Sequence, residues 1–81
     1  MPVRVLLFAG LREAAGTREL CVDLDAAAGI VELRAVLART CPRLAPLLAN
    51  AAIAVNEEYA DDDVRLQPGD TVALIPPVSG G

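Results

Sequence analysis

Histidine and lysine are absent from this chain of 81 residues, and serine occurs only at Ser79. Without histidine, the chain has no imidazole that could bind zinc, act as a general base or complete a Ser-His triad. Asp and Glu are the obvious acid-base groups that remain, and their spacing does not place two of them across a cleft. We therefore predict no metal site and no bound cofactor, and we do not expect an enzyme that acts alone.

The chain also lacks an excess of positive charge. Its formal net charge is −4, and its seven basic residues are arginines scattered along the sequence. A protein that binds nucleic acid needs a basic face for the phosphates, and this sequence has no Gly-rich phosphate loop either. We predict no nucleic acid partner, and we expect any nucleotide chemistry to be carried by a partner protein.

Long apolar runs are missing as well, since no segment approaches the roughly 18 residues of a membrane span. Met1-Pro2-Val3-Arg4 opens a short apolar run without a small-residue cleavage site, which does not fit a signal peptide. We predict no membrane association and a cytoplasmic location. Cys21 and Cys41 would stay reduced there, and their spacing fits neither a metal knuckle nor a redox pair, so we interpret both as small apolar residues.

The sequence does contain enough apolar residues for one small core, because 54% of the residues are hydrophobic and 22% are charged. Alternating apolar residues predict strands at residues 3–9, 18–24, 51–55 and 71–75. The side chains expected in the core are Val3, Val5, Leu7, Leu20, Val22, Leu24, Ile53, Val55, Val72 and Leu74. A single domain therefore accounts for residues 1–75.

The middle of the chain changes to a helical period. Its apolar stripe consists of Ile30, Leu33 and Leu37. This main helix should end near Thr40-Cys41, because Pro42 disfavours helical backbone in the residue before it. The leucines at positions 44, 47 and 48 are predicted to pack as a short irregular helix that closes one end of the core.

Three other segments are predicted to be loops or turns. Residues 10–17 have glycine near both ends and helix formers between, which predicts a loop holding a single helical turn. Residues 67–70 carry proline and glycine at the centre of a type II turn. We interpret Asp61-Asp62-Asp63 as a solvated acidic loop, since three adjacent aspartates make a poor calcium site.

This order of elements fits one α+β architecture. A mixed sheet of four or five strands, with one main helix packed across it, places the first and last strands side by side and parallel in the middle. Such a layout is the β-grasp, or ubiquitin-like, fold. The face opposite the helix would carry an apolar cluster, and exposed apolar clusters usually mark docking surfaces. The predicted docking residues are Leu6, Phe8, Tyr59, Ala73 and Ile75, unless loops cover them.

Residues 76–81 are predicted to form an extended tail. Pro76-Pro77 deny the chain further ladder hydrogen bonds, so the strand before them must end there. The tail then continues with Val78, Ser79, Gly80 and Gly81. Two final glycines without side chains would let it enter a narrow channel with its α-carboxylate accessible. The alternative is a frayed chain end.

Several stretches of the sequence resemble a known family. They are Phe8-Ala9-Gly10-Leu11-Arg12-Glu13, Ala54-Val55-Asn56, Pro68-Gly69-Asp70-Thr71-Val72-Ala73 and Pro76-Pro77-Val78-Ser79-Gly80-Gly81. Along its whole length the chain is similar to the ubiquitin-like sulfur carriers, and its tail favours the small subunit of molybdopterin synthase among them. Its aromatic content of 2% is unusual and leaves mainly aliphatic residues for a docking face.

The resemblance implies a carrier rather than a catalyst. The Gly81 carboxylate would be adenylated by an ATP-using enzyme of the ubiquitin-activating type and then converted to a thiocarboxylate with sulfur from a donor protein. Gly80 would keep the approach free of side chains. The tail would next enter the large subunit of molybdopterin synthase, within a heterotetramer, and donate sulfur to cyclic pyranopterin monophosphate. The resemblance also places the catalytic groups on the partners.

Other functions remain open. A sulfur carrier for thiamine, for cysteine or for tRNA thiolation would share the fold and the Gly-Gly end. A ubiquitin-like modifier would instead be joined through Gly81 to lysines of target proteins. A third alternative is a structural binding module whose tail is incidental, and truncation of Gly80-Gly81 would distinguish it.

Overall fold

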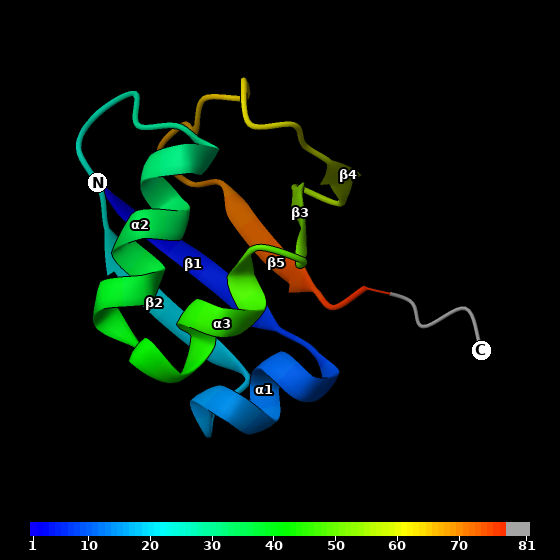
Figure 1. Cartoon of the computed structure of the whole chain (residues 1–81). Helices are drawn as coiled ribbons and strands as arrows, with labels where there is room; N and C mark the ends of the chain where they lie inside the picture. Colours follow the sequence, from blue (N-terminus) through cyan, green and yellow to red (C-terminus); the bar gives the residue numbers. More distant parts are fainter. Residues whose placement is uncertain (78–81) are drawn as a thin grey trace.

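The computed structural model describes residues 1–77, which form a mixed five-stranded sheet with a helix packed across one face (Figure 1). The elements are β1 (Pro2–Leu7), α1 (Ala9–Ala15), β2 (Glu19–Asp23), α2 (Ile30–Thr40), the 3-10 helix η1 (Pro42–Leu44), α3 (Ala45–Leu48), β3 (Ala52–Val55), β4 (Glu58–Tyr59) and β5 (Thr71–Ile75). The strand order in the sheet is β2-β1-β5-β3-β4. The predicted α+β, β-grasp arrangement is confirmed.

The two central strands, β1 and β5, run parallel, as the element order predicts. Val5 lies opposite Val72 in this pair, and Leu7 lies opposite Leu74. β2 pairs antiparallel with β1 on one side, and β3 pairs antiparallel with β5 on the other. Because β1 and β5 are parallel, both end at the same edge of the sheet, where α1 follows β1 and Pro76 follows β5 (Figure 1).

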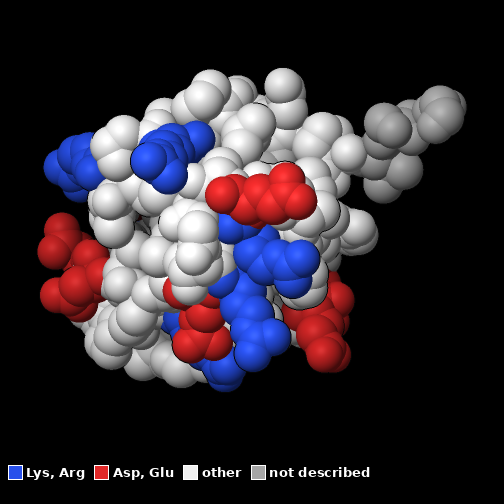
Figure 2. Space-filling model, turned by 90° about the horizontal axis from the view of Figure 1, so that it is seen from below, with Lys and Arg blue, Asp and Glu red and all other residues white. Residues whose placement is uncertain are grey.

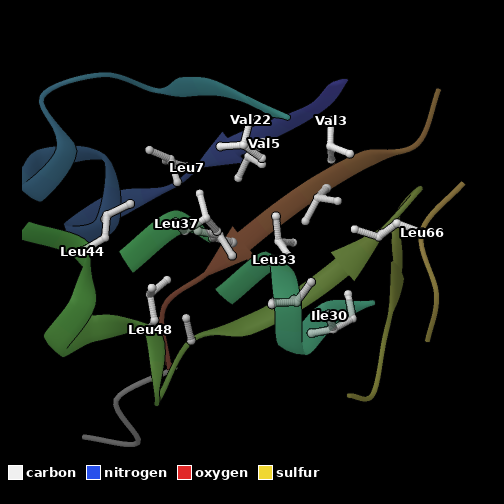
Figure 3. Packing of buried hydrophobic residues seen from close by; sticks show 14 of the residues in the cluster. Val3, Val5, Leu7, Val22, Ile30, Leu33, Leu37, Leu44, Leu48 and Leu66 are labelled. Atoms are coloured by element: carbon white, nitrogen blue, oxygen red, sulfur yellow. The ribbon is translucent and has the colours of Figure 1, made fainter. Parts of the chain in front are cut away.

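The core lies between the sheet and α2 (Figure 3). Ile30, Leu33 and Leu37, the predicted stripe of α2, are fully buried. The predicted inward residues of the strands are buried as well, apart from Leu20 and Val55, which are partly buried against the core. Among residues 1–77 no polar or charged residue is buried, so the two layers are held together chiefly by burial of apolar surface.

The first strand is shorter than predicted, and the segment after it is a helix. β1 ends at Leu7, and Ala9 then turns the backbone with a φ of 49°, which is incompatible with a strand. α1 runs for seven residues instead of the single turn expected, and it buries Leu11. Gly16 ends the helix in the left-handed conformation with a φ of 76°, and its N–H donates to the carbonyl oxygen of Arg12 at 2.9 Å.

The short helical segment after α2 closes one end of the core, with one difference from the prediction. Leu44 in η1 and Leu48 in α3 are buried, and their spacing of four residues puts them on the same side of the helical turn. The prediction for Leu47 is wrong, because its side chain is 39% exposed. It lies instead at the sheet edge beside Pro76 and Pro77.

The stretch between β3 and β5 contains a short strand that the sequence pattern does not show. Asn56 and Glu57 have φ angles of 50° and 72°, as in a two-residue hairpin turn, and they connect β3 to the two-residue strand β4. The predicted turn around Gly69 is confirmed. Gly69 has a φ of 89°, and the N–H of Asp70 donates to the carbonyl oxygen of Gln67 at 3.1 Å.

Arg34 ties the main helix to the segment that follows it. From α2 it donates hydrogen bonds to the carbonyl oxygens of Leu48 and Ala51, the second at 3.3 Å. Its Nε also lies 3.7 Å from a carboxylate oxygen of the exposed Asp62, a contact that contributes little at the surface. The guanidinium therefore donates to two carbonyl groups at the end of α3 and just beyond it, and the carbonyl oxygen of Leu48 also accepts from the N–H of Ala51 at 3.2 Å.

We expect Arg34→Met to lower the free energy of unfolding by about 2 kcal/mol. Methionine keeps much of the apolar stem but leaves the two partly buried carbonyl oxygens without their charged donor. Urea unfolding measures the change. Arg39→Met, at an exposed position of the same helix, is the control and should shift the free energy by less than about 0.5 kcal/mol. Equal losses in both variants would contradict the role given to Arg34.

Candidate functional site

The end of β5 leads directly into the predicted tail. Ile75 still pairs with Ala52, but Pro76 has no N–H and cannot continue the ladder as a donor. A mainly apolar groove of about 120 Å³, the exit groove, lies at this point. Its lining residues are Gly10, Leu11, Leu47, Asn50, Pro76 and Pro77. The chain therefore leaves the sheet beside α1 and the end of α3 (Figure 1).

The outer face of the sheet, opposite α2, carries a row of apolar side chains. Leu6 of β1 lies opposite Ala73 of β5. Ala54 of β3 lies between Ala73 and Tyr59 of β4. Directly opposed strand residues point to the same face, so these four side chains cross the sheet from β1 to β4. Ala73 and Ala54, in the middle of the row, have small side chains, so few side-chain atoms project from the sheet between Leu6 and Tyr59.

Phe8 adds an aromatic ring next to this row. With Leu6 and Ala73 it lines a shallow hollow of about 470 Å³, the outer hollow. The other lining residues are Asn56, Glu57 and Thr71. Phe8 is 47% exposed and Tyr59 is 76% exposed, and Ile75 shares the face of Ala73 because it lies two residues along the same strand. The structure thus brings the predicted docking residues to one side of the sheet, and their docking role stays a prediction.

This arrangement has counterparts among known proteins. The model of the ThiS family matches residues 5–81, which is nearly the whole chain. The chain belongs to the ThiS family. A curated relative, the molybdopterin synthase sulfur carrier subunit of Chlamydomonas reinhardtii, is 39% identical over 83 aligned positions that cover 100% of both chains.

Solved structures agree with the ThiS family assignment. SAMP1, a small archaeal modifier protein from Haloferax volcanii, matches with a TM-score of 0.89 and 31% identity, and the match covers 100% of both chains. A chain in the complex of subunits 1 and 2 of molybdopterin-converting factor from Helicobacter pylori 26695 matches with a TM-score of 0.73 and 32% identity, again over 100% of both chains. The fold and the length of this ThiS family member are therefore shared with proteins of two differently named types.

Gly81, the residue predicted to react in this ThiS family member, and the three tail residues before it lie outside the described residues. They are Val78, Ser79, Gly80 and Gly81. The family match extends through them to residue 81. Their roles in sulfur chemistry stay predictions, whereas Pro76 and Pro77 have defined positions at the exit groove.

Sequence reasoning missed a hydrogen-bonded clamp at the rim of the outer hollow. The side-chain amide of Asn56 donates to Asp70 Oδ1 at 2.9 Å, and its oxygen accepts from the N–H of Thr71 at 3.0 Å. Asp70 Oδ2 accepts from the N–H of Gln67 at 2.8 Å. These bonds join the β3–β4 hairpin to the turn that begins β5. Asn56 and Asp70 both occur in the stretches that carry the family resemblance, but nothing in the sequence pairs them.

Neither cysteine lines the exit groove or the outer hollow. Cys21 is exposed on β2, Cys41 is half-buried, and both are free thiols. Among residues 1–77, no three Cys, Asp or Glu side chains gather in a way that could hold a metal ion. The described helices also include none with the length and apolar character needed to cross a membrane.

Proposed function

We propose that this chain is the sulfur carrier subunit of molybdopterin synthase. The observation that carries the proposal is its similarity, over the full length of both chains, to a protein with that name from Chlamydomonas reinhardtii. The structure around β5 supports it. Buried Val72 and Leu74 anchor this central strand, and the strand delivers the chain to the sheet edge at Pro76.

The proposed reacting group is the α-carboxylate of Gly81. A carboxylate is a poor electrophile, so an adenylating enzyme of the ubiquitin-activating type joins one of its oxygens to the AMP part of ATP and releases pyrophosphate. The acyl adenylate has a good leaving group, and sulfur supplied by a donor protein at the oxidation level of sulfide displaces AMP to give a thiocarboxylate. The sulfur then passes to cyclic pyranopterin monophosphate while water restores the Gly81 carboxylate, and two such transfers complete the dithiolene of molybdopterin.

Catalysis in this scheme is assigned to the partner proteins. The chain has neither histidine nor lysine, so general acids, bases and phosphate-binding groups are placed on the large subunit and the adenylating enzyme. ATP is used by the adenylating enzyme, and this chain binds no cofactor of its own. The complex of subunits 1 and 2 from Helicobacter pylori supports a large-subunit partner, and we expect a heterotetramer.

The outer face is the proposed contact with these partners. Its apolar residues are Leu6, Phe8, Tyr59, Ala73 and Ile75. A partially exposed apolar surface next to the exit of the tail allows a partner to hold the domain while Gly81 reaches the partner's active site.

A second function is favoured by the match to SAMP1. The description of that protein as a small archaeal modifier points to attachment of Gly81 to target proteins. An acyl adenylate would then react with a lysine amine of the target, form an amide and release AMP. Because the chain has no lysine, its own side chains offer no such acceptor. Carriers for thiamine, cysteine or tRNA thiolation keep the thiocarboxylate and differ in the acceptor.

Intact-mass analysis tests the sulfur carrier proposal. After incubation with the adenylating enzyme, ATP and a sulfur donor, we expect a species heavier by the mass difference between sulfur and oxygen, located at Gly81 by fragmentation. Omission of ATP is the control and should leave only the carboxylate. If the complete reaction also leaves only the carboxylate, the proposal is wrong. Products heavier by a whole target protein would favour the modifier function.

A further inference from the structure

Three arginines from different parts of the chain line one hollow beside the outer face. Arg4 of β1, Arg12 of α1 and Arg18 just before β2 meet there with Leu6 and Phe8, around a volume of about 360 Å³. The remaining lining residues are Leu7 and Glu19. These arginines form the arginine cluster, which the fold gathers although they are scattered in the sequence.

The positive charge of the arginine cluster is not balanced by its lining. Glu19 is the only acidic lining residue, and its carboxylate already accepts a hydrogen bond from Arg4 Nε at 2.8 Å. Arg12 and Arg18 are exposed and have no ion pair or side-chain hydrogen bond within residues 1–77. Figure 2, viewed toward the end of the molecule that carries α1, shows a band of basic side chains between acidic ones.

The arginine cluster is continuous with the proposed docking surface. Leu6 and Phe8 line both the hollow of the cluster and the hollow of the outer face. A protein that covers Phe8 therefore comes within reach of Arg12 and Arg18. The chain as a whole has a net charge of −4, so these arginines create a local positive potential that differs from the rest of the surface and that a partner can recognise.

We propose that the arginine cluster binds the carboxylates of an acidic segment on the partner protein that docks on the outer face. This inference rests on the proposed function, which supplies the partners. The planar guanidinium pairs with a carboxylate through two parallel hydrogen bonds, and the apolar side chains of Leu6 and Phe8 reduce competition from water. Charge pairs at the edge of an interface act mainly on the association rate and on partner choice. That suits a carrier that must leave one enzyme and find another.

The test is charge reversal at the two arginines without an ion-pair partner in the described chain. Association of Arg12→Glu/Arg18→Glu with the purified large subunit and with the purified adenylating enzyme is followed by stopped flow over a series of salt concentrations. At low ionic strength we expect association with at least one of them to slow by about tenfold or more. The difference should shrink as salt is added, and the thermal unfolding midpoint should stay near that of the wild type.

The matched control is Arg39→Glu/Arg43→Glu, which has the same net charge. Both arginines are exposed, and they lie on α2 and η1 outside the hollow. We expect its association rates to stay close to those of the wild type, because the acidic segment does not meet this side of the molecule.

Each outcome decides between the proposals. Equal association rates for the two double variants, with both partners, would overturn the arginine cluster proposal and leave the sulfur carrier function standing. A wild-type chain that binds neither partner would overturn both.

Discussion

Deletion of Gly80 and Gly81 is expected to abolish sulfur loading and to leave the domain as stable as the wild type. The deletion moves the α-carboxylate to Ser79 and shortens an extended tail by about 7 Å, so the reacting atom no longer reaches its place in the adenylating enzyme. The buried core of the described residues runs from Val3 to Leu74, so no core side chain is lost. Intact-mass analysis should find no thiocarboxylate, and urea unfolding should give an unchanged midpoint.

Two further variants show whether sulfur loading is lost because the terminal carboxylate has moved or because the residues of the tail have changed. One added alanine after Gly81 keeps every native residue but moves the carboxylate to a new one, and it should also fail to load. Ser79→Ala keeps the length and both glycines, and it should load like the wild type. If the deleted chain still carries sulfur, Gly81 is not the reacting residue. If it also retains every cellular function of the wild type, the chain is a binding module with an incidental tail.

The strands and the faces of their side chains could be predicted because alternation decides both at once. Val3, Val5 and Leu7 are buried as the period of two requires, and Leu6 between them faces the opposite side. The parallel pairing of β1 with β5 follows from the order of the elements and the rules for crossover connections. The outer face of the candidate site could therefore be read from sequence.

The features of the fold that the sequence did not predict depend on single backbone angles or on hydrogen bonds between residues far apart in the chain. Ala9 adopts a positive φ that glycine or asparagine would signal and alanine does not, so the end of β1 and the length of α1 were predicted wrongly. β4 has two residues, too few for any period to appear. Arg34 bonds to backbone carbonyls 14 and 17 residues away, which no side-chain pattern records.

The arginine cluster beside the candidate site could not be predicted from the sequence either. Arg4, Arg12 and Arg18 belong to a strand, a helix and a loop, so no single helical or strand period relates the positions of their side chains. They meet because α1 turns back across the end of β1 at Ala9 and because β2 pairs with β1. The net charge of the sequence is negative, but the fold brings three arginines together into a basic site on its surface.

Phe8→Asp is expected to weaken binding to the large subunit by at least about 2 kcal/mol, roughly thirtyfold in the dissociation constant. Phe8 is the only phenylalanine of the chain, it is 47% exposed, and it lines both hollows. An aromatic side chain at such a position is typical of residues that dominate an interface, and an aspartate would have to lose its water there. Isothermal titration calorimetry with the purified large subunit measures the affinity.

The position of Phe8 at the start of α1 separates binding from folding. Phe8 is the N-cap residue, with extended backbone and no side-chain capping hydrogen bond. Aspartate and serine are favoured N-caps, so Phe8→Asp and Phe8→Ser should keep or raise the stability of the domain while both weaken binding. The pair also separates loss of the ring from addition of a negative charge near the arginine cluster.

Val31→Asp is the matched control for Phe8→Asp. Val31 is 58% exposed on α2, the helix that covers the other face of the sheet, and its substitution changes the net charge by the same amount. It should bind the large subunit like the wild type. Unfolding of Phe8→Asp would show that Phe8 supports the core rather than a partner. Wild-type affinity in Phe8→Asp and Phe8→Ser would place the contact with the large subunit away from the outer face.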